Sequence, residues 1–313
     1  MRNRTALVLG LALVGVPAWA SAQLYQQDFD VDSTATWTVN AGPSDHAVDF
    51  FFDYSTAGIP SAPNSAGTTR GMKLQANQTN GIFSGFSVSP TGQSFGGNYT
   101  VRFDWWSNFN GPFPAGGSGS TQLSTFGIGS SGAVAQWPGA PVQESVWFAA
   151  TGDGNSSADW RAYSSAAATG YPDASTVFAA AGAGNRNHSH PYYAGFGNNT
   201  APAAQLALFP QQTGNTLVGS SAMEWHDVVI DVNGTLATWT VDGLLIATID
   251  LTTVTLGGGN LFFGHSDTNA TSSTDPEDVN LLFTLIDNVR VVPEPASFGL
   301  IAGAALLGLR RRK

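Results

Sequence analysis

The chain has 313 residues, no cysteine and a formal charge of −10, from 22 acidic against 12 basic residues. Six of the basic residues lie in residues 1–22 and 293–313, so the 270 residues between them carry 21 acids against 6 bases, a charge of −15. Such a surface repels nucleic acid, which we therefore exclude as a partner. Without cysteine no disulfide can form, so stability must come from core burial or a bound metal.

The N-terminus reads as an export signal. Arg2 and Arg4 precede an apolar run from Ala6 to Val16, Pro17 ends that run, and Ala20-Ser21-Ala22 is a small-residue cleavage site. The run is too short to span a bilayer comfortably. We predict a signal peptide over residues 1–22, removed by signal peptidase so that the mature chain begins at Gln23, with an uncleaved anchor as the alternative.

The body shows strand patterns and almost no helix pattern. Tyr99 to Trp105 alternates polar and apolar residues, as a half-buried strand does, and Gln143 to Ala149 is a second apolar run. Between them and beyond, residues 108–139 and 152–199 are rich in Gly, Ala, Ser and Asn. We predict that these two stretches are long loops carrying short strands, and such loops are often functional or mobile.

The clearest unit is a three-stranded meander. Two apolar stretches, residues 226–232 and 236–241, flank Asn233-Gly234, which is a hairpin turn signal. Asp242-Gly243 supplies a second turn before the next strand, and residues 261–265 and 281–292 read as two more strands. Many short strands separated by such turns predict an all-β antiparallel sandwich or barrel.

The C-terminus has three parts in order. Pro293-Glu294-Pro295 is held extended by its prolines, Phe298 to Leu309 carries no charge, and Arg310, Arg311, Arg312 and Lys313 stay on the cytoplasmic side of a membrane. This order resembles the PEP-CTERM sorting signal of bacteria. The resemblance implies transient anchoring in the inner membrane, removal of residues 293–313 by an exosortase, and delivery to the cell surface or extracellular matrix. A plain C-terminal membrane anchor is the alternative.

The body also resembles a known fold group. Residues 224–249, with a Trp before a strand and the Val241-Asp242-Gly243 turn, resemble concanavalin A-like and laminin-G-like jelly rolls. Gln27-Asp-Phe-Asp30 and Leu285 to Val291 resemble the first and last strands of such domains. The resemblance implies one jelly-roll sandwich over residues 23–292, from a group whose members bind sugars, bind proteins or hydrolyse glycans.

Catalytic motifs are missing from the body. Glycoside hydrolysis needs two carboxylates flanking the bond, and alternate residues of one strand can supply them. The body has three glutamates, Glu144, Glu224 and Glu277, and none is followed by Asp two residues on and then a second Glu. A nucleophile elbow is also missing, and His188-Ser-His190 offers zinc only two ligands. We therefore predict a non-catalytic protein.

A structural calcium ion is the one cofactor that we predict. First and last strands of jelly rolls often pair, which would bring Asp28 or Asp30 near Asp287. Carboxylates and backbone carbonyls suit this hard cation. The alternative is that these acids face water or cap turns.

Exposed aromatic rings are the predicted ligand platform. Trp160, Tyr192 and Tyr193 lie in the predicted loops among Asn, Asp and Ser, the composition that a sugar site needs. The resulting hypothesis is a secreted surface or matrix protein that binds exopolysaccharide. The alternatives are a glycan hydrolase with an unrecognised site and a purely structural coat protein.

Overall fold

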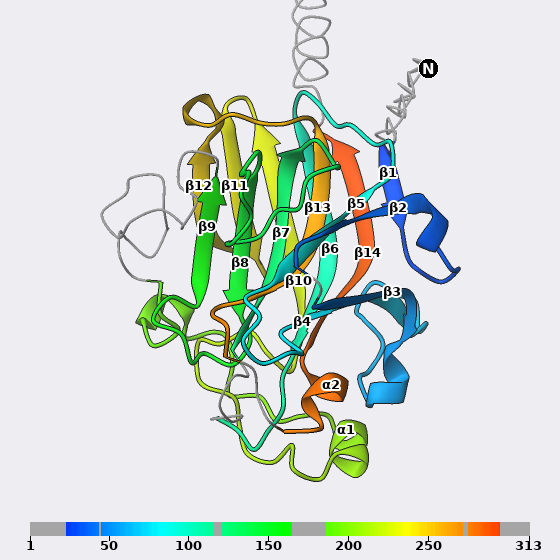
Figure 1. Cartoon of the computed structure of the whole chain (residues 1–313), viewed down its shortest axis with the longest axis vertical. Coiled ribbons are helices and arrows are strands. Elements are labelled where there is room, and N and C mark those ends of the chain that lie inside the picture. The colour runs from blue at the N-terminus through cyan, green and yellow to red at the C-terminus, as the bar shows by residue number, and fades with distance from the viewer. Residues whose placement is uncertain (1–22, 44, 115–120, 165–185, 272–274, 295–313) are drawn as a thin grey trace, which may run out of the picture.

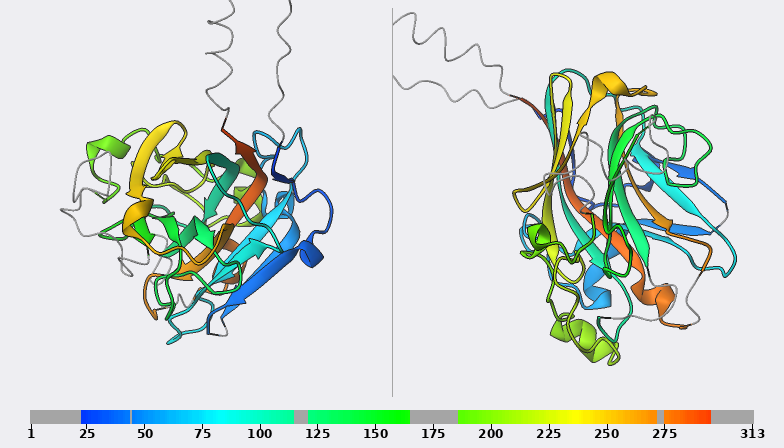
Figure 2. Two further views of the ribbon diagram at one scale, coloured as in Figure 1. Left: turned by 90° about the horizontal axis from the view of Figure 1, so that it is seen from above. Right: turned by 90° about the vertical axis from the view of Figure 1, so that its left-hand side faces the viewer.

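The computed structural model describes residues 23–43, 45–114, 121–164, 186–271 and 275–294. Two antiparallel sheets pack face to face, and the right-hand view of Figure 2 shows them edge on as two layers. The prediction of an all-β antiparallel sandwich with a jelly-roll-like fold is confirmed. Strand-forming runs with polar and apolar alternation produce this arrangement, because each sheet must bury one face.

The larger sheet has eight strands, and seven of them follow one hydrogen-bonded order (Figure 1). An eighth, β1, pairs only with the C-terminal strand β14. The order is β12 (Leu244–Asp250), β11 (Leu236–Val241), β10 (Trp225–Asn233), β6 (Tyr99–Asn108), β14 (Phe283–Pro293), β4 (Arg70–Ala76) and β3 (His46–Asp53), with β1 at Tyr25–Gln27.

The smaller sheet has six strands, and two of them lie in the stretches that we predicted to be long loops carrying short strands. Residues 108–139 hold β7, and residues 152–199 hold β9, whose first residue is Trp160. The order is β2 (Trp37–Ala41), β5 (Gly85–Pro90), β13 (Asn260–Asp267), β7 (Gln122–Ser130), β8 (Val146–Thr151) and β9 (Trp160–Ser164).

The predicted meander is present as β10, β11 and β12. Val241 pairs with Leu244, so Asp242 and Gly243 form a two-residue turn, and both have the positive φ that a type I′ turn requires, 50° and 78°. In the first hairpin Asn233 pairs with Leu236. The turn therefore falls on residues 234–235, one position later than the Asn-Gly signal predicts.

First and last strands pair, as the sequence predicts. Tyr25 lies opposite Val291 and Gln27 lies opposite Val289. On its other side β14 pairs with β6 along most of its length, from Phe283 opposite Asn108 to Pro293 opposite Tyr99. The last strand is therefore held on both edges in the middle of the larger sheet.

Two apolar clusters cover the two faces of the larger sheet. Trp105, on the inner face of β6, is fully buried in the core between the sheets. Trp106 points the other way and is still only 2% exposed, because it packs in an outer cluster with Tyr54 and Met223. This outer cluster forms where residues 54–69, which we call the roof loop, and residues 194–223 fold over the sheet.

The two α-helices among the described residues are short and lie at one end of the sandwich. α1 (Ala203–Leu208) and α2 (Asp278–Leu281) sit at the lower end of Figure 1, away from the end where β1 begins and β14 finishes. Within the described ranges, no helix is long and apolar enough to cross a membrane. Four 3₁₀ turns complete the elements: η1 (Thr34–Thr36), η2 (Tyr54–Ala57), η3 (Pro191–Tyr193) and η4 (Leu251–Thr253). The predicted signal peptide, Pro295, Arg310, Arg311 and Arg312 lie outside the described residues.

Candidate functional site

The predicted aromatic platform is not exposed. Trp160 is 1% exposed and Tyr193 is fully buried, with their rings stacked 5.3 Å apart. The Trp160 indole N–H donates to the carbonyl of Gly219 at 3.1 Å. The prediction that these two rings face solvent is wrong, because residues 186–196 pack against Trp160 in the core.

Tyr192 has a different role from its neighbour. Its ring is half-buried and its hydroxyl donates to the carbonyl of Leu245 at 2.7 Å. Leu245 belongs to β12, the edge strand of the larger sheet. Tyr192 therefore satisfies an edge carbonyl, which helps to protect that edge from pairing with another chain.

The predicted calcium ligands are not brought together. Asp28 accepts a hydrogen bond from the backbone N–H of Asp30, which is a local turn contact. Asp287 is fully buried and accepts hydrogen bonds from Tyr54 and Ser65 of the roof loop. Among the described residues, no three His, Cys, Asp or Glu side chains are placed to hold a metal. The strand pairing was predicted correctly, but the side chain of Asp287 is held by the roof loop.

A pair of buried carboxylates lies under the roof loop. Asp104 and Asp287 are directly opposed on β6 and β14, and both are fully buried. Asn64 donates to Asp104 from its backbone at 3.1 Å and from its amide at 2.7 Å, and Asn288 donates at 2.8 Å. Burial raises the pKa of Asp287 to about 7, and the neighbouring charge of Asp104 acts in the same direction. Sequence spacing gave no sign of this pair, because the two residues are 183 positions apart.

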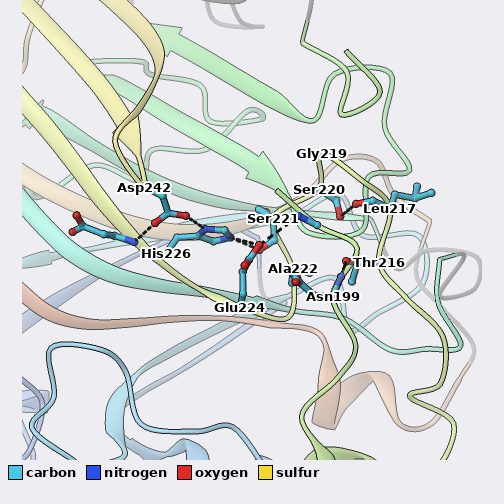
Figure 3. A network of polar contacts seen from close by, with 12 residues as sticks. Asn199, Thr216, Leu217, Gly219, Ser220, Ser221, Ala222, Glu224, His226 and Asp242 are labelled. Carbon is cyan, nitrogen blue, oxygen red and sulfur yellow. Dashed lines mark hydrogen bonds and ion pairs between the residues drawn. The ribbon is translucent and has the colours of Figure 1, made fainter. Parts of the chain in front are cut away.

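A second buried network centres on His226 of β10 (Figure 3). The imidazole Nδ1 lies 2.7 Å from a carboxylate oxygen of Asp242, and Nε2 lies 2.8 Å from the carbonyl of Ser221. Burial alone would lower the pKa of His226, but the hydrogen bond and charge of Asp242 raise it overall. With acceptors at both nitrogens, His226 is best satisfied as an imidazolium that donates twice.

This network joins three segments and does not form a nucleophile. The hydroxyl of Ser221 donates to the carbonyl of Thr151 at 3.3 Å, while His226 contacts only the backbone of Ser221. The ring also stacks beside Trp105, with centroids 5.1 Å apart. The chemistry available here is therefore structural: a buried charge ties the 242–243 turn to the segment that precedes β10.

The histidine pair considered for zinc is held by the backbone. His188 Nδ1 lies 2.7 Å from the carbonyl of Val218, and the ring of His190 accepts a hydrogen bond from the N–H of Tyr192 at 3.2 Å, capping η3. Both rings therefore contribute to the local fold.

A groove lies against the smaller sheet, where the turn after β2 meets the β7–β8 loop. Its volume is about 640 Å³. Phe83 is 38% exposed on one wall, and its ring lies edge-on to that of Trp137 with centroids 5.0 Å apart. Small apolar residues complete the lining: Ala41, Gly42, Pro43, Ala133, Val134, Ala135, Gly139 and Pro141.

The groove is pre-formed because the β7–β8 loop is tied down along its length. Asn40 donates to the carbonyl of Gly132 at 3.1 Å, the N–H of Gln136 donates to Ser87 at 3.0 Å, and Gln143 donates to the carbonyl of Trp137 at 2.8 Å. Gly85 leaves room for the indole, since a Cβ there would lie 2.8 Å from the ring of Trp137. A rigid site avoids the entropy cost of ordering a loop on binding.

The lining has no charged side chain. A charged ligand would lose water in such a groove without gaining a partner, so its binding is disfavoured. A neutral ligand with one apolar face fits better, because Phe83 can cover that face while backbone groups meet its polar edge. A smaller groove across the same turn, of about 370 Å³, contains Asp45, whose carboxylate already accepts from the N–H groups of Gln78 and Thr79.

Comparisons with known proteins find only distant structural similarity. No protein-family model matches the chain, and no curated protein matches its sequence. Among solved structures, a Bacillus subtilis protein of unknown function with a galectin-like fold is 9% identical, with 87% of this chain and 96% of that chain covered and a TM-score of 0.45. A Bacillus licheniformis β-glucanase is 12% identical, with 86% of this chain and 98% of that chain covered and a TM-score of 0.41. The carbohydrate-binding module CBM66 from Bacillus subtilis is 8% identical, with 82% of this chain and 95% of that chain covered and a TM-score of 0.39. Similarity at this level carries no argument about activity.

Proposed function

We propose that this chain is an exported, non-catalytic protein that binds a neutral polysaccharide in the groove between Phe83 and Trp137. The observation that carries the proposal is a pre-formed groove of about 640 Å³ with an exposed aromatic wall and no charged lining residue. Aromatic faces cover the apolar C–H patches of a pyranose ring. The groove takes the place of the platform at Trp160 and Tyr193 that the sequence predicted.

Export and tail processing form the second half of the proposal. It rests on the sequence of residues 1–22 and on the order of Pro-Glu-Pro, apolar run and arginines in residues 293–313. Signal peptidase and an exosortase are the proposed processing partners. The protein would be held at the inner membrane by its tail and then passed to the cell surface or matrix, where the polysaccharide is its proposed ligand.

A non-catalytic role is supported by the placement of the acids. The adjacent carboxylates of Asp104 and Asp287 have no exposed surface and are already hydrogen-bonded by side chains of the roof loop and by Asn288. Carboxylates that cleave a glycosidic bond must flank the substrate. Release of reducing sugar from the bound polysaccharide would instead favour the hydrolase alternative.

Retention on polysaccharide tests the binding proposal. The neutral exopolysaccharide of the producing bacterium is cast into a native gel, and the mobility of the protein is compared with and without it. Wild type should be retarded equally at low and high salt, because a neutral glycan releases no counterions. Phe83→Ala should abolish retardation.

Leu208→Ala is the matched control, since Leu208 is another exposed apolar side chain, on α1, which packs against η2 beside the larger sheet and does not line the groove. Its retardation should equal that of wild type. Retardation that survives Phe83→Ala, or that disappears with salt, would contradict the groove as the binding site. No retardation of wild type would favour the structural coat protein.

A further inference from the structure

One end of the sandwich is built from three loops that contact one another. They are residues 91–98, 233–235 and 251–259, and we call them the terminal end. The N–H of Phe95 donates to the carbonyl of Gly259 at 2.6 Å, and the N–H of Gly234 donates to the side chain of Asn98 at 2.9 Å. The N–H of Leu251 donates to the carbonyl of Thr235 at 2.7 Å, so the three loops form one continuous surface.

This surface is uncharged although the body is strongly acidic. None of the residues in the three loops is Asp, Glu, Lys or Arg. Leucines stand out at its margin: Leu24 is 45% exposed, Leu236 44% and Leu256 36%. Acids at the margin of the terminal end have partners on the protein: Asp250 caps Thr252, Asp32 caps Thr34, Glu144 accepts from Ser131, and Asp231 and Glu294 lie within hydrogen-bond distance of the Thr100 hydroxyl.

Both chain ends leave the sandwich here. The N–H of Leu24 donates to the carbonyl of Val291 at 2.8 Å. Pro293 lies opposite Tyr99, and the N–H of Glu294 donates to the carbonyl of Asn98 at 3.1 Å. The chain is therefore fixed to the sheet as far as Glu294, and Figure 1 shows β1 beginning and β14 finishing at this end.

The connection from the sheet to the apolar run is very short. The run begins at Phe298, so residues 295–297 are all that separate it from Glu294. The four Cα–Cα steps from Glu294 to Phe298 span at most about 14 Å. If the apolar run lies in a bilayer, the loops around Glu294 must lie against or within about 14 Å of the lipid surface.

We propose that the terminal end is a lipid-facing surface, on which the folded body rests while its tail is in the membrane. The inference rests on the membrane-held tail of the proposed function. Uncharged loops can approach a bilayer without the desolvation cost of a charge, and exposed leucines gain by entering its interface. The acids around this end make zwitterionic lipid the preferred surface, since anionic headgroups would be repelled.

This orientation also directs the groove outward. Gly85, which underlies Trp137, begins β5 at the end of the smaller sheet opposite the terminal end, and Ala41 ends β2 there. The end of the groove beside Gly85 is thus held on the side of the body that faces away from the lipid. A membrane-held chain could then engage polysaccharide before its tail is removed.

Fluorescence quenching by lipid tests the surface in the full chain. Since the chain has no cysteine, Leu256→Cys, Leu236→Cys and Leu208→Cys each allow one environment-sensitive label. Each labelled chain is reconstituted into phosphatidylcholine vesicles that contain a headgroup spin label, and attachment is first confirmed by flotation. Labels on the Leu256→Cys and Leu236→Cys variants should be quenched. The label on Leu208→Cys should not, because a ten-residue strand such as β6 separates the two ends by roughly 30 Å.

The outcomes are distinct. Quenching at the two terminal-end positions but not on Leu208→Cys supports the inference. A chain that floats but shows equal or no quenching at these positions overturns it, while tail anchoring stands. A chain that does not float removes both the anchoring and this inference, and leaves the polysaccharide experiment unaffected. A Leu256→Cys signal that changes with protein concentration in detergent, without vesicles, assigns the surface to a second copy and also overturns the inference.

Discussion

Asp104 and Asp287 face each other across β6 and β14, fully buried, and the donors that hold them are neutral. Asn64 binds the first and Ser65 binds the second, so the roof loop is fixed to the sheet through this acid pair. Two adjacent carboxylates cannot both ionise easily in a buried site. The attachment of the roof loop should therefore depend on a proton.

Stability should fall as this proton is lost. Burial raises the pKa of Asp287 to about 7, above its value in the unfolded chain. Its favourable contribution is therefore complete below about pH 4 and is lost as the pH rises toward 7. The free energy of unfolding that is lost between pH 4 and pH 7 is at most roughly 4 kcal/mol. In urea unfolding, the difference in free energy between Asp287→Asn and wild type should shift in favour of the variant as the pH rises from 4 to 8.

Asp53→Asn is the control from the start of the same loop. Its carboxylate caps η2 by accepting from Ser55, which lowers the pKa of Asp53. Its contribution is present above the unfolded pKa and is lost as the pH falls, so this variant should approach wild type in acid. A pH trend for Asp287→Asn that follows that of Asp53→Asn would contradict the raised pKa.

The His226 network should respond in the neutral range. Because the folded pKa of His226 is raised, its contribution is complete below about 6.5 and is lost as the pH rises through the folded value. Asp242→Asn should cost about 1–3 kcal/mol at pH 6 and less at pH 9. Urea unfolding at the two pH values measures the cost, and the NMR shifts of the imidazole protons report the pKa directly.

Glu224→Gln provides the comparison, since its carboxylate is 3.9 Å from Nε2 of His226 and partly exposed. Its cost should be clearly smaller than that of Asp242→Asn. Equal costs at both pH values for Asp242→Asn would mean that the hydrogen bond, and not the imidazole charge, is what the turn requires.

Local chemistry was enough to predict some of the strands. Alternation identified β6, and Asp242-Gly243 fixed both the turn and the pairing of Val241 with Leu244. Each of these features is decided within a few neighbouring residues. The pairing of β1 with β14 is long-range, and it was predicted only because first and last strands of this kind of sandwich often pair.

The candidate site could not be predicted in the same way. Trp160 was placed in a loop because glycine and asparagine surround it, yet residues 186–196 fold back and stack Tyr193 on its ring. Phe83 gave no sequence signal, since its exposure depends on where the β7–β8 loop crosses the smaller sheet. Such placements arise from contacts between segments far apart in the chain, which composition and periodicity do not record.

Truncating Trp160 should damage the fold. The indole is 1% exposed and stacks on Tyr193, so Trp160→Ala should cost about 3–5 kcal/mol of unfolding free energy. Phe83→Ala, at a ring that is 38% exposed, should cost less than about 1 kcal/mol. Thermal and urea unfolding of the two variants measure both values. A small cost for Trp160→Ala would mean that the ring is not part of the core in solution.

Filling the space beneath Trp137 should remove binding while most of the stability remains. A Cβ on Gly85 would lie 2.8 Å from the indole of Trp137 and 2.6 Å from the Cβ of Ser266, so Gly85→Ala must displace the ring or the strand. Overpacking of this kind costs about 1–3 kcal/mol. The shifted indole should change the shape of the groove beside Phe83, and the retardation of the protein by the polysaccharide gel should therefore fall.

Gly96→Ala serves as the control, because it adds a methyl group in open space. Gly67→Ala is less suitable as a control, because the φ of Gly67 is 99° and an alanine there would be strained. Unchanged retardation for Gly85→Ala, together with a measurable loss of stability, would separate the groove from polysaccharide binding.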